Sequence, residues 1–127
     1  MIDKKNLLII DDSEIDRSIL KNILIDDFTV FEASNGYDGL KQLIEKRNRI
    51  DGVLLDLHMP ILDGFHVLEL MKEHKIYNIP IVIVTSESTE ENLVKTLPYL
   101  ISDFICKPYD KEFIQKRMRT LFHIKWV

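Results

Sequence analysis

Residues 52–60 read Gly52-Val-Leu-Leu-Asp56-Leu-His58-Met-Pro60, and we expect the fold and the chemistry of the chain to be organised around them. The first four residues carry no polar side chain, which is typical of a central strand in a parallel sheet covered on both faces. The run ends at the carboxylate of Asp56, and a loop and a helix start follow at Asp63-Gly64. Ligands of open α/β sheets lie at such strand ends. Taken alone, the stretch leaves open whether Asp56 is only the polar end of a strand.

Outward from this stretch, two kinds of apolar pattern alternate along the chain. Strands are expected at residues 6–10, 29–33, 52–55, 81–84 and 103–106. Helices are expected at about 13–26, between the Asn35-Gly36 break and residue 44, and at about 64–74, 89–98 and 111–122. This alternation predicts a parallel sheet with helices on both faces and right-handed crossovers. The carboxyl ends of all the strands then lie at one edge of the sheet.

Two of these helices carry apolar residues at helical spacing. Those of the first helix are Ile15, Ile19, Leu20, Ile23 and Leu24, and those of the fourth are Leu93, Val94 and Leu97. Spacing of this kind predicts amphipathic helices with one apolar side. Pro98 is expected to end the fourth helix.

The composition is that of one folded domain spanning residues 1–127. The chain has 127 residues and a formal net charge of −4, which argues against a broadly basic surface for nucleic acid. No apolar run is long enough to cross a membrane, and the first residues do not resemble a secretory signal. The lone cysteine, Cys106, allows no internal disulfide and fits a cytoplasmic location.

The strand ends together carry a set of groups suited to phosphoryl chemistry. They are Asp11-Asp12, Asp56, Thr85-Ser86 and Lys107-Pro108. Three clustered carboxylates repel one another unless a cation lies among them, and Mg²⁺ is commonly held by carboxylates and phosphate oxygens. A lysine and a hydroxyl can donate to the oxygens of a phosphoryl group. The set therefore predicts a nucleophilic carboxylate, a divalent metal and two donors.

In order and on these elements, the motifs resemble those of the response-regulator receiver domain of two-component signalling. The motifs are the acidic pair, Asp56-x-x-Met-Pro-x-x-Asp63-Gly64, Thr85-Ser86 and Lys107-Pro108, and the resemblance runs from Asn6 to about Leu121. It implies a flavodoxin-like (βα)5 doubly wound fold with a five-stranded parallel sheet in the order 2-1-3-4-5. It also implies a signalling switch rather than an enzyme, with no output domain within this chain.

The resemblance assigns the acceptor and the metal ligands. It implies that Asp56 accepts a phosphoryl group from a phosphohistidine on a sensor histidine kinase or a phosphotransfer protein. Mg²⁺, or Mn²⁺ in its place, is expected to bind Asp12, Asp56 and the backbone carbonyl of His58 directly, with Asp11 assisting through water. The resemblance also implies that His58 and Glu87, which flank the acceptor, tune the lifetime of the phosphoryl group; the alternative is that both side chains are merely solvated.

The resemblance also assigns the switch. It implies that Thr85 bonds a phosphoryl oxygen, that Lys107 pairs with Asp56 or its phosphate, and that Phe104 moves inward as the aromatic switch residue. The surface of the fourth helix, fifth strand and fifth helix would then control a downstream effector protein or a fused output domain. The Lys107-Pro108 bond resembles one that is cis in the family. Neither nucleic acid nor membrane binding is implied, and the domain would be a monomer or a phosphorylation-dependent dimer.

Three alternatives stay open. An aspartyl-phosphate phosphohydrolase of the haloacid-dehalogenase type needs a second aspartate two residues after the nucleophile, where this chain has His58. A flavodoxin-like nucleotide binder needs a Gly-, Ser- and Thr-rich loop after the first strand, whereas residues 11–14 are mostly acidic. The chain is also compatible with the N-terminal part of a longer regulator, because residues 113–126 resemble the exits of receivers fused to cyclic-dinucleotide enzymes.

Overall fold

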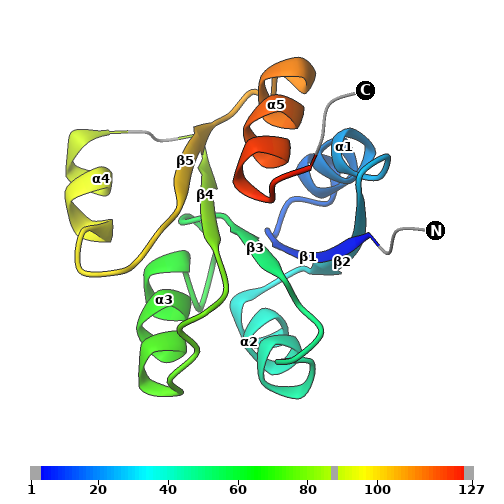
Figure 1. Cartoon of the computed structure of the whole chain (residues 1–127). Coiled ribbons are helices and arrows are strands. Elements are labelled where there is room, and N and C mark those ends of the chain that lie inside the picture. Colours follow the sequence, from blue (N-terminus) through cyan, green and yellow to red (C-terminus); the bar gives the residue numbers. More distant parts are fainter. Residues whose placement is uncertain (1–3, 87–88, 125–127) are drawn as a thin grey trace.

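The computed structural model describes residues 4–86 and 89–124, so Glu87 and the last tail residues lie outside the described part. Within it, strands and helices alternate as the sequence predicted (Figure 1). The strands are β1 (Lys5–Ile10), β2 (Phe28–Ala33), β3 (Gly52–Leu55), β4 (Ile81–Thr85) and β5 (Asp103–Cys106). The helices are α1 (Glu14–Leu24), α2 (Gly36–Glu45), α3 (Gly64–Glu73), α4 (Glu90–Thr96) and α5 (Lys111–Leu121). The predicted ends of α1, α3, α4 and α5 were one to two residues too late.

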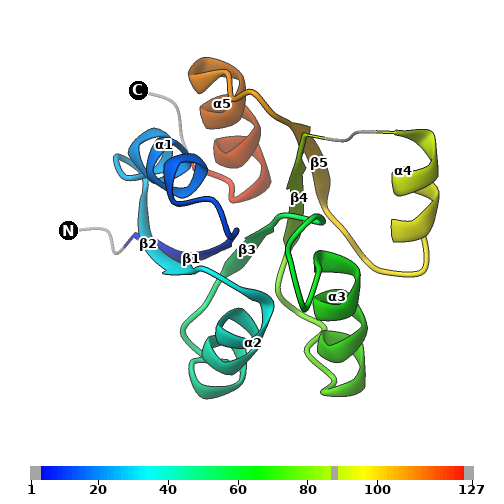
Figure 2. The ribbon, with the colours of Figure 1, turned by 180° about the vertical axis from the view of Figure 1, so that it is seen from behind.

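The five strands form one parallel sheet in the order β2-β1-β3-β4-β5, which confirms the predicted topology. Helices α1 and α5 cover one face, and α2 and α3 cover the other, while α4 lies at the β5 end of the molecule (Figures 1 and 2). Because every pair is parallel, all five strand ends point to the same edge. The chain reverses its direction across the sheet between β1 and β3, the position at which such folds place their ligands.

The core is divided by the sheet into two layers, because successive side chains of a strand point to opposite faces. Leu8, Ile10, Val53 and Leu55 pack toward α2 and α3, whereas the alternate residues pack toward α1 and α5. All four residues of β3 are buried, as predicted for a strand covered on both sides. The strand that leads to Asp56 is thus packed on both faces.

Some apolar residues of two helices lie outside this core, although Leu20, Ile23 and Leu24 of α1 are buried in it. Ile15 and Ile19 of α1 are 73% and 44% exposed. In α4, the residues expected on one apolar side, Leu93, Val94 and Leu97, are exposed, while Asn92 and Thr96 are buried. The inner face of α4 therefore carries two polar side chains, of which Asn92 bonds to His58.

Candidate functional site

The site is built around carboxylates that leave the sheet side by side. Ile10 of β1 is paired with Leu55 of β3, so the residues that follow them, Asp11 and Asp56, emerge next to each other. The Asp56 N–H donates to the Ile10 carbonyl over 3.0 Å and fixes this register at the strand end. Asp11, Asp12 and Asp56 each offer an oxygen, and these atoms lie within 4.8 Å of one another. The predicted cluster of three carboxylates is therefore formed.

The loop after β3 is held against Asp56 by close backbone contact. A Cβ atom at Gly64 would lie 2.4 Å from the Asp56 carbonyl oxygen, so only glycine fits there. The Gly64 N–H donates to the carbonyl of Leu57 over 3.0 Å, and the His58 N–H donates to Asp56 Oδ1 over 3.0 Å. The Asp56 carboxylate is thus oriented by the loop that follows it.

Lys107 supplies the cation of the site from the end of β5. Its Nζ donates to Asp11 Oδ2 at 2.8 Å, to Asp56 Oδ2 at 3.0 Å and to Asp16 Oδ2 at 2.7 Å. Burial alone would lower the pKa of Lys107, but the three carboxylates outweigh it and raise the pKa above its usual value of 10.5. The ammonium is therefore charged under physiological conditions.

The negative charge of Asp56 is only partly balanced by its hydrogen-bond partners. Burial raises the pKa of Asp56 above the usual 3.8, and the neighbouring charge of Asp11 adds to this effect. The bonds from the His58 N–H and from Lys107 oppose the rise without cancelling it. Since the anionic form is disfavoured by burial and by like charge, a further cation at this position would stabilise it.

The donor set fits a hard divalent cation. Magnesium takes oxygen ligands at about 2.1 Å, so two oxygens on opposite sides of one ion are about 4.2 Å apart. One oxygen from each of the three carboxylates lies within 4.8 Å of the other two, which is close to that distance. Asp12 is exposed, whereas Asp11 and Asp56 are buried.

The predicted switch residues lie on the neighbouring strands. Thr85 is fully buried at the end of β4, and its carbonyl accepts the Lys107 N–H over 2.8 Å. Phe104 of β5 is partly exposed and packs against the core layer that includes Leu55 and Ile83. The Lys107-Pro108 bond is cis, as the resemblance implied.

Two contacts in the site were not anticipated from the sequence. Asp16 lies in the first turn of α1, where the helix dipole alone favours an acid, yet it is also a direct partner of Lys107. Asn92 of α4 was not singled out, yet its Nδ2 donates to His58 Nε2 over 3.2 Å. Asp16 and Lys107 are 91 residues apart in the sequence, so only their shared sheet edge could have suggested the contact.

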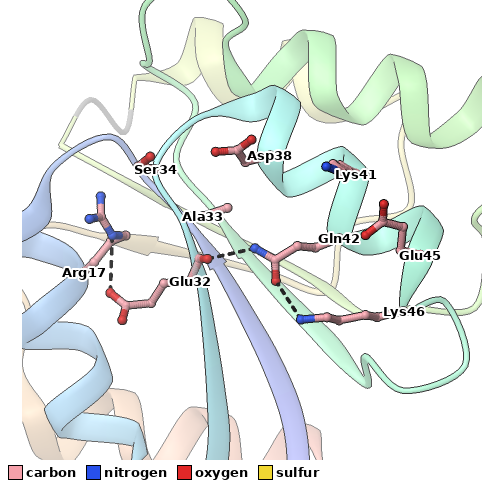
Figure 3. Close-up of a pocket in the computed structure, with 9 residues that line it drawn as sticks. All are labelled: Arg17, Glu32, Ala33, Ser34, Asp38, Lys41, Gln42, Glu45 and Lys46. Carbon is pink, nitrogen blue, oxygen red and sulfur yellow. Dashed lines mark hydrogen bonds and ion pairs between the residues drawn. The ribbon is translucent and has the colours of Figure 1, made fainter.

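A separate polar depression of about 440 Å³ lies beside β2 and α2 (Figure 3). Its side chains include Arg17, Glu32, Gln42 and Lys46, and they bond mainly to one another. Arg17 also donates to the backbone carbonyl of Asp11 over 2.7 Å. The charged groups here balance one another, so this depression supports the strand end rather than offering a second reactive centre.

Comparisons with known proteins agree with this geometry. The sequence model described as "Response regulator receiver domain" matches residues 7–119. "Sensor histidine kinase CheAY" of Helicobacter pylori is 34% identical over 110 residues, which are 85% of this chain and 14% of that protein. "Transcriptional regulatory protein SrrA" of Staphylococcus aureus is 34% identical over 116 residues, which are 91% of this chain and 46% of that protein. This chain thus spans less than half the length of these relatives.

Solved structures of CheY proteins are similar in fold to this chain. In the CheX-CheY-BeF3-Mg+2 complex from Borrelia burgdorferi, the matching chain is 27% identical with a TM-score of 0.83, over 93% of this chain and 89% of that one. The chemotaxis protein CheY4 of Vibrio cholerae, at 23% identity and a TM-score of 0.83 over 93% and 98% of the two chains, shares the fold. In the part of the chain that the structure describes, the helices are all too short or too polar to cross a membrane.

Proposed function

The chain belongs to the response-regulator receiver domain family of two-component signalling, and from this membership and its site we propose that it is a switch whose phosphoacceptor is Asp56. Receiver domains are signalling switches that accept a phosphoryl group and interact with histidine kinases and effectors. The observation that carries the assignment is the geometry of Asp56, which is held by the His58 N–H and Lys107 beside two further carboxylates. The phosphohydrolase and nucleotide-binder alternatives are not favoured by the family match.

The transfer step follows from the groups at the strand ends. A carboxylate oxygen of Asp56 attacks the phosphorus of a phosphohistidine, and a P–O bond forms as the P–N bond breaks. The electron pair of the broken bond stays on the imidazole nitrogen of the partner. Lys107 donates to the incoming oxygens, and Thr85 supplies a hydroxyl donor from the next strand.

Magnesium, or manganese in its place, is the proposed cofactor. Asp12, Asp56 and the carbonyl of His58 would hold it directly, and Asp11 would assist through water. When bound, the ion neutralises the charge that develops on the phosphoryl oxygens. The acidic cluster supports this proposal because its oxygens suit a hard cation and because burial raises the pKa of Asp56, whose anionic form a cation would stabilise.

The proposed output runs from Thr85 through Phe104 to α4, β5 and α5. Phosphorylation adds negative charge and acceptor oxygens at Asp56, toward which the Thr85 hydroxyl would move. Phe104 would then turn inward, which would change the surface that a partner binds. The proposed partners are a sensor histidine kinase or a phosphotransfer protein upstream, and an effector protein or an attached output domain downstream. The lone cysteine fits action in a reducing cytoplasm.

The assignment is tested by labelling with acetyl phosphate and Mg²⁺. Intact mass spectrometry should show one acid-labile phosphoryl group on the natural chain and none on Asp56→Asn, because an amide is a poor nucleophile. Asp26→Asn removes an exposed carboxylate outside the cluster and should be labelled normally. A phosphoryl group mapped to a different carboxylate would refute the assignment of Asp56.

A further inference from the structure

Asp16 stands out because it is the nearest of the three carboxylates to the Lys107 ammonium. The distance from Asp16 Oδ2 to Lys107 Nζ is 2.7 Å, whereas Asp56 Oδ2 lies at 3.0 Å. Asp16 belongs to the first turn of α1, where the Ser13 side chain accepts its N–H over 3.2 Å. The N-cap of α1 thus places a third acid from outside the strand ends against the cation of the site.

The donors of Lys107 are fully used in this arrangement. An ammonium has three N–H groups, and here they face Asp11, Asp16 and Asp56. A phosphoryl group on Asp56 adds oxygens that need a donor and roughly one further negative charge. The N–H that now faces Asp56 can pass to one of these oxygens. For Lys107 to donate to a second one, either Asp11 or Asp16 must give up its bond.

Exposure decides which partner is released. The side chain of Asp11 is 1% exposed, so its carboxylate would lose the ammonium with little water to replace it. The side chain of Asp16 is 33% exposed, so water can take over the bond at much lower cost. Asp16 is therefore the carboxylate that Lys107 leaves most readily.

We propose that Asp16 is a positioning residue that competes with the phosphoryl group for the Lys107 ammonium and thereby weakens the hold of the site on that group. The inference rests on the proposed function, because it takes Asp56 as the acceptor. It adds a residue of α1 that acts against the phosphorylated state, in contrast to Thr85 and Lys107, which favour it.

Beryllium fluoride with Mg²⁺, a mimic of the phosphoryl group, provides the test. Titration calorimetry should show Asp16→Asn binding the mimic about tenfold more tightly than the natural chain, the order expected for one charge-assisted hydrogen bond. Glu14→Gln is the matched control, since it removes an exposed acid from the same helical turn. It should change the affinity by less than about twofold, as a screened surface charge does.

Two further measurements separate competition from structural support. Asp16→Glu restores the charge and should return the affinity toward the natural value. Affinity for Mg²⁺ alone should fall or stay level in Asp16→Asn, because a negative charge has been removed. A residue that only supports the fold would, when replaced, weaken binding of the mimic or leave it unchanged.

The outcomes also separate this inference from the proposed function. One outcome is that the natural chain binds the mimic at Asp56, while Asp16→Asn binds it no more tightly than Glu14→Gln does. The proposed competition by Asp16 is then refuted, and Asp56 stands as the acceptor. If neither the natural chain nor Asp16→Asn binds the mimic at Asp56, the acceptor assignment fails and the competition fails with it.

Discussion

Tyr109 lies two residues after Lys107 in the sequence, and its side chain carries a buried hydroxyl. Its oxygen is buried and has no hydrogen-bond partner among the described residues. Burial raises the pKa of Tyr109 above the usual 10, so the group stays neutral near the carboxylates. A buried donor without a partner destabilises the folded state.

We therefore expect Tyr109→Phe to raise the free energy of unfolding by about 1 kcal/mol, because the unpaired hydroxyl is removed while the ring keeps its packing. Urea denaturation followed by circular dichroism would measure the change. Tyr77→Phe, at a ring that is 59% exposed, should leave stability within about 0.5 kcal/mol. A lower free energy of unfolding in Tyr109→Phe would show that the Tyr109 hydroxyl makes a stabilising hydrogen bond in solution.

Single residues of the site differ in how far the sequence reveals them. Asp56 and Lys107 could be placed because each follows an apolar run, and parallel strand ends must meet. Asp16 could not, because a helical residue in the first turn is favourable for local reasons alone. Its contact depends on the side-chain direction of α1 relative to β5, which no local pattern encodes.

At the scale of elements, β5 and α5 are joined by an ion pair that also borders Phe104. Arg117 Nε donates to Asp103 Oδ2 over 2.7 Å, and Arg117 Nη2 donates to Asp103 Oδ1. Burial alone would raise the pKa of Asp103, but the bonds from Arg117 and the Phe104 N–H outweigh it and lower the pKa below the usual 3.8. The pair therefore stabilises the fold only while Asp103 is ionised.

The sign of the pH dependence follows from that lowered pKa. Arg117→Gln should lower the free energy of unfolding by up to about 1 kcal/mol at neutral pH, the range of a partly exposed pair. The full difference should persist above pH 3.8 and vanish as the pH falls through the folded pKa of Asp103, because protonation breaks the pair in the natural chain. Denaturation at several pH values measures it, and Lys116→Gln, at an exposed neighbour, should show no such trend.

The orientation of α4 is the element-scale feature that sequence pattern predicted least well. The periodic Leu93, Val94 and Leu97 are exposed, and Asn92 faces inward to His58. A pattern of apolar spacing finds a face but cannot say whether the core or a binding partner covers it. The start of α4 was predictable, since Thr89 caps it by accepting the Asn92 N–H.

At the scale of the whole molecule, the order and kind of all the elements followed from alternating patterns, because strand burial and helix periodicity leave separate signals. The clustering of Asp11, Asp12 and Asp56 was also predictable, because parallel strands end at one edge of the sheet. We expect the mutual repulsion of these carboxylates to lower the free energy of unfolding when no metal is bound. A cation that binds only the folded state should offset this by mass action.

Addition of Mg²⁺ at about 100 times its dissociation constant should therefore raise stability by about 2.7 kcal/mol and the melting temperature by several degrees. Asp12→Ala should abolish the shift while raising the melting temperature in EDTA, because one repelling charge is lost. Differential scanning calorimetry of both proteins with and without Mg²⁺ measures the effect. An equal Mg²⁺ shift in Asp12→Ala would place the ion elsewhere.

Because the sheet is parallel, the carboxyl ends of the strands lie at one edge and the amino ends at the opposite edge. The carboxyl ends of the strands hold the three clustered carboxylates and Lys107. Exposed residues such as Asn48 and Asn78 lie in the loops that lead into the opposite ends of β3 and β4. A dye or a surface tether attached at those loops would sit a full strand length from Asp56. The protein could thus be immobilised by one end while phosphoryl exchange is followed at the other.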